Sequence, residues 1–195
     1  MTEQSERDRG PQGRTGYTLI EVMMVLAIFG VMAALAIPRL NTRGFHADAA
    51  ARSVRGTLQV AQRTAVARQY DVIVSFDAAT NAMRVTEDRN TNGNIDGGER
   101  TSWHRLDGGP AFVTPPSALA GFSGDGGIII PRVRTIGGLP SVIFRRNGAA
   151  SSELAVYMAG LAGDTTSLRA ITMEQATGRT RWFRYLDGAW KPASQ

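Results

Sequence analysis

The sequence contains no cysteine, two histidines and a single lysine. Without cysteine, disulfide frameworks, zinc-thiolate sites and cysteine nucleophiles are excluded. His46 and His104 lie far apart without a metal-ligand spacing, so we expect ordinary surface or loop residues at both positions. Phosphate-binding and dinucleotide-binding loop motifs are also absent, and no serine is paired with a usable histidine. The sequence therefore predicts neither an enzyme nor a protein with a small-molecule substrate.

Basic residues outnumber acidic residues. Lys and Arg number 22 against 17 Asp and Glu, which gives a formal net charge of +5, and Lys191 is the only one of these cations that is not arginine. A basic surface suits nucleic acid, anionic lipid or an acidic protein and does not choose among them. The length of 195 residues allows one modest domain and an anchor.

A long apolar segment lies near the N-terminus. Residues 22–37 include no charged side chain, and with residues 17–21 they approach the ~20 residues that cross ~30 Å of hydrocarbon. Charges flank the segment on both sides, so the positive-inside rule does not fix its orientation. A secretory signal peptide cut near Ala34 or Ala36, or a plain signal anchor, would also contain such a segment.

Glu21 distinguishes this segment from a plain anchor. It is a lone carboxylate close to the start of the apolar helix, where an acid is costly and indicates a function. Neither a signal peptide nor a signal anchor explains Glu21, and neither explains Gly16, the glycine that ends a polar stretch over residues 1–15.

The stretch "GYTLIEV" followed by an apolar helix resembles the leader of type IV pilins and pseudopilins. The resemblance implies that a prepilin peptidase cuts between Gly16 and Tyr17 and that Tyr17 is then N-methylated. Glu21 would become the fifth mature residue and pair with the N-terminal amine of a neighbouring subunit, and Pro38 would bend the helix. The resemblance also implies one pass through the bacterial inner membrane, with the N-terminus cytoplasmic and the remaining domain outside.

After Pro38 the pattern becomes that of an amphipathic helix over residues 39–69. Its expected buried positions are Phe45, Ala50, Val54, Leu58, Ala61 and Ala65, and its expected solvated positions are Arg52, Arg55 and Arg63. Strands are predicted over 70–77, 82–88, 102–106, 127–133, 141–148, 153–159, 168–174 and 179–186. The Gly- and Pro-rich residues 108–127 are predicted to form a loop. A helix followed by strands predicts an α+β fold with an antiparallel sheet packed on the helix.

The order of these parts resembles the GspH/FimT family of minor pseudopilins. The matching pieces are "AARSVRGTLQVAQRTAV", "DVIVSFD", "DRNTNGNIDGGER", "VIFRRNGAA" and "TGRTR". The resemblance divides the chain into a leader over 1–16, a transmembrane helix over 17–38, an amphipathic helix over 39–69 and a β-rich domain over 70–195.

Residues 88–99 fit the pattern of a calcium-binding loop. The oxygen ligands would come from Asp88, Asn90, Asn92, Asn94, Asp96 and Glu99, with Gly93 at the turn. Predicted strands, not a helix pair, flank this loop, and its three asparagines lower its negative charge. A long hairpin turn uses the same residue types, so this alternative stays open. No other cofactor is expected.

The stretch "GRTRWFRY" interleaves Arg179, Arg181 and Arg184 with three aromatic residues. On a strand, Arg179 and Arg181 share one face. Arginine pairs with phosphate and aromatic side chains stack on bases, so DNA binding is one interpretation. Similarity to competence proteins of the family with a "GRxR" motif implies the same. A final strand with buried aromatics and solvated arginines is the alternative.

Together these observations predict a minor pseudopilin of the type II secretion pseudopilus, which assembles with other pseudopilins in a filament. The main alternative is a minor type IV pilin of a pilus or DNA-uptake machine that binds DNA through Arg179 and Arg181. A third interpretation is a signal-anchored calcium-binding domain without a filament role, in which Glu21 would have no purpose.

Overall fold

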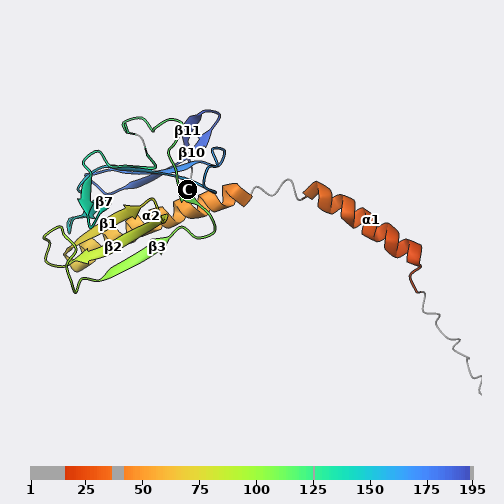
Figure 1. Ribbon diagram of the computed structural model, residues 1–195, viewed down its shortest axis with the longest axis horizontal. Coiled ribbons are helices and arrows are strands. Elements are labelled where there is room, and N and C mark those ends of the chain that lie inside the picture. The colour runs from red at the N-terminus through yellow and green to blue at the C-terminus, as the bar shows by residue number, and fades with distance from the viewer. Residues whose placement is uncertain (1–15, 37–41, 125, 194–195) are drawn as a thin grey trace, which may run out of the picture. The chain divides into compact units, whose positions relative to one another are not determined.

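The structure, a computed structural model, describes residues 16–36, 42–124 and 126–193. They belong to two compact units, which divide between Asn41 and Thr42. The first unit contains helix α1 (Leu19–Ala36), and the second contains helix α2 (Thr42–Arg68) and all the described strands (Figure 1). Pro38, the predicted bend, lies outside the described residues.

Helix α1 begins after Thr18, whose side-chain oxygen accepts a hydrogen bond from the Glu21 backbone N–H at 3.3 Å. This is an N-cap, which satisfies a backbone donor that would otherwise have no partner. Every described side chain of residues 16–33 is exposed. Within residues 16–36, 42–124 and 126–193, no helix has both the length and the apolar character needed to span a membrane. Membrane insertion of residues 17–38 stays a prediction.

Helix α2 is amphipathic, as predicted, with one exception. The predicted alanine, valine and leucine positions are buried, and Ala47 and Ala51 are buried with them. The expectation for Phe45 was wrong, because 69% of its surface is exposed. Its five-residue step to Ala50 does not follow the helical repeat, so the side chain falls opposite the buried stripe. Helix α2 ends at Arg68, and the next residue, Gln69, has a left-handed φ of 59°.

The strands form two antiparallel sheets, where the sequence predicted one. The first sheet has the order β3 (Thr101–Arg105), β2 (Ala82–Asp88), β1 (Asp71–Asp77), β7 (Leu139–Phe144) and β6 (Arg134–Ile136). The second has the order β11 (Ala189–Pro192), β10 (Thr180–Leu186), β9 (Arg169–Met173), β8 (Leu154–Ala159) and β4 (Ala111–Phe112), and β5 (Ile128–Ile129) also pairs with β8. The α+β class is confirmed, while most of the strand predicted over 127–133 is not a strand.

Helix α2 lies against the strands of its unit (Figure 1), and one hydrophobic core joins it to both sheets. Leu58 of α2 packs in the same cluster as Val74 of β1 and Val156 of β8. The loop predicted over 108–127 is interrupted by β4, which belongs to the second sheet. Ala118, Leu119 and Phe122 of this segment pack on the other face of that sheet. There the Leu119 N–H donates to the Tyr157 hydroxyl at 2.9 Å, and the Trp190 Nε1–H donates to the Ser117 carbonyl at 2.8 Å.

Asp48 links α2 to the second sheet through two arginines. Arg169 Nε donates to one carboxylate oxygen at 2.5 Å, and Arg184 Nη2 donates to the other at 3.1 Å. The side chains of Arg169 and Asp48 are only 10% and 17% exposed. Because the charges lie largely out of water, each depends on its partner for stabilisation.

A close backbone approach at Gly160 gives the first testable prediction. A Cβ atom on Gly160 would overlap the Arg43 carbonyl oxygen, which belongs to the backbone of α2 and cannot rotate away. We expect Gly160→Ala to lower the free energy of unfolding by ~1–3 kcal/mol through overpacking. Gly56→Ala is the control, because a Cβ there meets nothing within 4 Å and alanine favours the helix by ~1 kcal/mol. Urea unfolding measures the free energy of unfolding of both variants. Equal stability of the two would contradict the close approach of Gly160 to the Arg43 backbone.

Candidate functional site

The predicted cleavage junction is accessible in the structure. Tyr17 is 82% exposed, and a Cβ on Gly16 would meet nothing within 4 Å. Glu21 follows in the first turn of α1, where a carboxylate also interacts favourably with the helix dipole. The two described residues of the junction are exposed, and cleavage and methylation there stay predictions.

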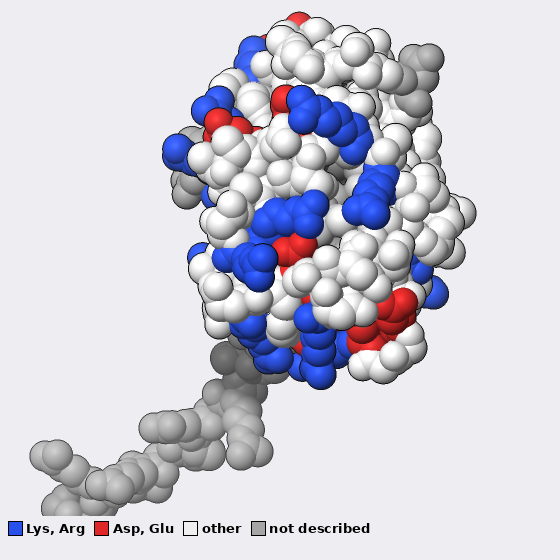
Figure 2. Space-filling model, turned by 90° about the vertical axis from the view of Figure 1, so that its left-hand side faces the viewer, with Lys and Arg blue, Asp and Glu red and all other residues white. Residues whose placement is uncertain are grey.

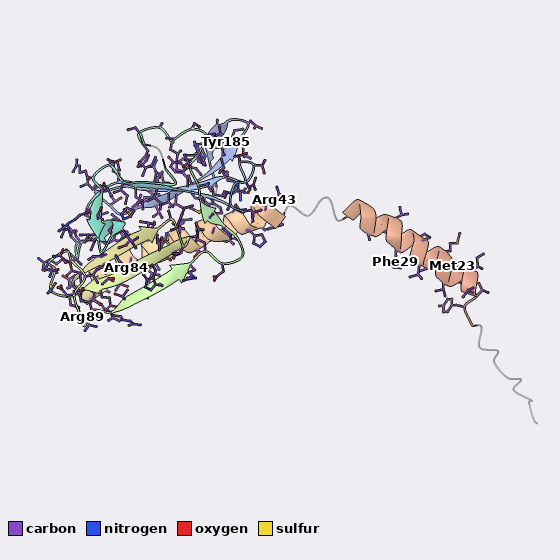
Figure 3. All side chains as sticks on the ribbon, viewed as in Figure 1. Met23, Phe29, Arg43, Arg84, Arg89 and Tyr185 are labelled. Carbon is purple, nitrogen blue, oxygen red and sulfur yellow. The ribbon has the colours of Figure 1, made fainter. Side chains whose placement is uncertain are left out.

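The apolar side chains of α1 have no described partner. Figure 3 shows Met23 and Phe29 projecting from the helix, where they are 63% and 65% exposed. Leu19 and Ile20 are 81% and 76% exposed. A side chain of this kind gains ~1.5–3 kcal/mol when it is fully buried. Over residues 19–33, helix α1 therefore exposes apolar side chains to solvent.

The loop after β2 brings together the residues of the calcium motif. The Asp88 carboxylate accepts hydrogen bonds from the Asn92 and Gly93 backbone N–H groups at 3.1 and 2.7 Å. Asp96 Oδ2 accepts from the side-chain amides of Asn90 and Asn92 at 2.8 and 2.6 Å. The amide groups of Asn90 and Asn92 hold the pKa of Asp96 below its usual value. The loop is thus a folded turn in which Asp88 and one oxygen of Asp96 are used by internal hydrogen bonds, while Glu99 Oε1 is buried without a hydrogen-bond partner among the described residues.

Calcium binding at this loop stays a prediction. Among the described residues, no group of three or more Asp, Glu, His or Cys side chains is arranged to hold a metal ion. Because a cation must displace the asparagine donors from Asp96, the calcium hypothesis expects weak binding, with a Kd of ~10⁻⁴–10⁻³ M. Calorimetric titration with calcium chloride tests it. Asp96→Asn should abolish the heat and the distant Asp187→Asn should not, while a flat wild-type titration at these concentrations would reject the site.

The C-terminal arginines divide into two kinds. Arg179 and Arg181 are exposed, and their guanidinium groups make no hydrogen bond or ion pair with any described residue. Arg184 instead binds Asp48, so it differs from the solvated arginine that the alternative interpretation of this strand assumed. Trp182 and Phe183 pack on opposite faces of the second sheet, Trp182 toward α2 and Phe183 beside Trp190. The aromatic residues between the arginines therefore contribute to the packing of the sheet.

Arg179 and Arg181 line a cavity of about 350 Å³, and the structure adds a third arginine to it. Arg55 of α2 lies at the same cavity, although the sequence predicted a solvated position. No local pattern could indicate this neighbour, because the two segments are far apart in the sequence. Glu153 and Glu174 lie with Arg179 and Arg181 at a second cavity of about 240 Å³ and reduce the positive potential there. Basic side chains are also spread over the face in Figure 2.

Two different family models match two separate parts of the chain. The family model of the prokaryotic N-terminal methylation motif matches residues 12–37. The family model of type II transport protein GspH matches residues 50–177. The pilin-like protein PilA1 of Thermus thermophilus is 34% identical over 87 residues, which are 44% of this chain and 56% of PilA1. The chain thus spans little more than half the length of this relative.

Two solved structures of the minor pseudopilin EpsH from the type II secretion system of Vibrio cholerae are also similar. Their TM-scores are 0.46 and 0.45, each with 14% sequence identity. The first match covers 71% of this chain and 97% of the EpsH chain, and the second covers 70% and 92%.

Proposed function

Because this chain belongs to the type II transport protein GspH family, we propose that it is a minor pseudopilin of a type II secretion pseudopilus. Its role is to build and assemble the filament, without catalysis. The observation that carries the proposal is the apolar helix α1, which follows an open Gly16–Tyr17 junction and buries none of its described side chains within its own unit. In a filament, neighbouring helices would supply the missing contacts.

The proposal includes the maturation that the N-terminal motif implies. A prepilin peptidase cuts between Gly16 and Tyr17, and Tyr17 is N-methylated. Helix α1 first holds the precursor in the inner membrane with residues 1–16 in the cytoplasm and the β-rich domain outside. The match of residues 12–37 to the methylation motif supports this sequence of events.

Assembly can be tested by crosslinking, because the chain has no cysteine of its own. A single cysteine replaces Met24, an exposed residue of α1, and the variant is produced together with a set of type II secretion pseudopilins, each carrying a single cysteine in its N-terminal helix. Oxidation should give disulfide-linked pairs between this chain and other pseudopilins. The same cysteine at Ser194, outside α1, is the control. Equal or absent crosslinking at both positions would contradict assembly through α1.

A second candidate function is that of a minor type IV pilin in a pilus or DNA-uptake machine. It rests on the guanidinium groups of Arg179 and Arg181, which pair with no described residue and lie at one cavity with Arg55. Arginine binds phosphate oxygens in a bidentate manner, so such a group of cations suits a DNA backbone.

A salt series separates the two candidates. For the DNA-uptake candidate, we expect the full-length chain in detergent to bind a single-stranded oligonucleotide, with an affinity that falls steeply as salt rises. Arg179→Ala with Arg181→Ala should weaken binding at least ~10-fold, since two phosphate contacts are lost. Arg63→Ala with Arg146→Ala is the charge-matched control. Absence of binding at low salt, or an equal effect of both double variants, would reject the DNA-uptake candidate and leave the secretion pseudopilus as the remaining one.

A further inference from the structure

A groove of about 550 Å³ runs between α2 and the first sheet, away from the C-terminal arginines. Its apolar surface comes from Val60 and Ala61 of α2, Val72 of β1 and Val85 of β2. Val60 is 61% exposed, which leaves part of this apolar surface open to solvent. The outer wall is formed by Ser102 and His104 of β3.

Strand β3 is an edge strand whose outer side is unpaired among the described residues (Figure 1). All five of its residues are exposed. Two backbone hydrogen bonds flank β3, from the Leu106 N–H to the Asn81 carbonyl and from the Glu87 N–H to the Arg100 carbonyl. In this register the backbone N–H and C=O groups of Ser102 and His104 face β2. Thr101, Trp103 and Arg105 therefore direct their backbone N–H and C=O groups to the open edge. Such an edge can accept another strand.

The ends of the groove are positively charged. Arg52 lies on α2 at one end, and Arg68 and Arg100 lie at the other. Arg68 is 3.7 Å from the Glu87 carboxylate. Burial raises the pKa of the Glu87 carboxyl, but the hydrogen bond from Tyr70 and the nearby Arg68 guanidinium outweigh this effect. The pKa of Glu87 is therefore below its usual value, which favours the charged carboxylate. Arg52 forms no ion pair with a described residue, and Arg100 also acts on the Glu87 carboxylate. Three arginines line the groove against this one carboxylate, so a net positive charge remains.

We propose that this groove and the free edge of β3 bind an extended segment of a partner protein, which carries carboxylates at its two ends and aliphatic side chains between them. The segment adds to β3 as a further strand, and alternate side chains enter the groove. The aliphatic side chains cover the surface around Val60 and Val85, and the carboxylates pair with Arg52 and Arg100. This binding surface goes beyond the filament contacts of α1.

The spacing of the arginines at the two ends suggests the length of the segment. Arg68 lies at the same end of the groove as Arg100. Arg52 and Arg68 are sixteen residues apart on α2, which corresponds to roughly 24 Å along the helix axis. A strand of seven residues spans roughly 20 Å between its end residues, and their side chains cover the difference. The probe is therefore the peptide Glu-Thr-Val-Thr-Val-Thr-Glu, which presents both glutamates and both valines on the same face.

The test measures fluorescence anisotropy of this labelled peptide with the full-length chain in detergent micelles. We expect saturable binding, at least tenfold weaker binding when lysine replaces both glutamates, and a comparable loss when the edge-facing amides are N-methylated. Arg52→Ala with Arg100→Ala should weaken binding at least tenfold, and Arg63→Ala with Arg146→Ala, outside both the groove and β3, should not. Gly56→Leu, which fills the groove from a position with open space, should also prevent binding.

Several results would overturn the proposal. These are the absence of saturation up to ~1 mM peptide, equal binding of the glutamate and lysine peptides, or an equal effect of the two double variants. The full-length chain should also keep the same size in the wild type and in Gly56→Leu. If the wild type forms dimers that Gly56→Leu separates, a second copy of the chain occupies the groove and the partner proposal is wrong.

Discussion

Replacing Glu21 with alanine is expected to reduce crosslinking of α1 to neighbouring pseudopilins at least ~10-fold, while cleavage after Gly16 continues. In the proposed filament, the Glu21 carboxylate pairs with the free amine of Tyr17 on a neighbouring subunit. Two opposite charges attract more strongly in a helix bundle of low dielectric constant than in water. Removing one of them leaves the other charge buried and unpaired, which strongly disfavours the assembled state.

The loss in Glu21→Ala should not arise from a damaged helix. Alanine favours a helix at least as well as glutamate, and the Thr18 cap of α1 involves the backbone N–H of residue 21, which alanine retains. Glu6→Ala is the control, because residue 6 would be removed with the leader. The measurement combines the single-cysteine crosslink with the mass of the processed chain. Undiminished crosslinking in Glu21→Ala would show that this charge pair does not direct assembly.

Asp48→Ala is expected to lower the free energy of unfolding by ~3–5 kcal/mol, because it leaves Arg169 buried without a counter-charge. Asp48 accepts from Arg169 and Arg184 and so connects α2 to β9 and β10. Asp48→Asn keeps the size of the side chain but removes its charge, and it should also destabilise. The expected loss of stability comes from leaving one charge without its partner. It is not a measure of what the intact pair contributes, because a buried ion pair often stabilises a protein no more than apolar packing of the same volume.

Asp187→Ala is the control for Asp48. Asp187 pairs with Lys191 at 2.7 Å, but its side chain is 85% exposed. The Lys191 ammonium group lowers the pKa of Asp187. Water nevertheless screens this pair, so its loss should change stability far less than the loss of Asp48. Urea unfolding of both variants is the measurement. Similar values for Asp48→Ala and Asp187→Ala would show that burial of Arg169 does not matter.

Local patterns in the sequence were sufficient for much of the fold. The alternation over residues 70–77 predicted β1, because Val72 and Val74 pack on α2 while the residues between them face the other side. The helical repeat from Ala50 to Ala65 predicted the buried side of α2 for the same reason. The strand predicted over 141–148 ends at Phe144, since the Gly148 N–H bonds to the Arg145 carbonyl and closes a turn.

Features that depend on distant contacts could not be predicted. Strand β4 has only two residues, and Phe112 is buried because it packs against Phe76 with ring centres 6.3 Å apart. The division into two sheets likewise depends on which strands pair, and strand patterns alone do not specify this. For the candidate sites, the sequence placed Gly16, Glu21 and the C-terminal arginines, but the neighbourhood of Arg55 and the groove beside β3 exist only in the folded domain.

The most direct test of a filament subunit built on α1 is the mass of its mature N-terminus. The full-length chain is produced together with a prepilin peptidase, extracted from membranes and measured intact and after digestion. We expect a chain that begins at Tyr17 and is heavier there by one methyl group, with residues 1–16 removed. A chain that retains Met1, or one cut near Ala36 as a secretory signal peptide would be, would contradict maturation as a pseudopilin and would remove the amine with which Glu21 is proposed to pair.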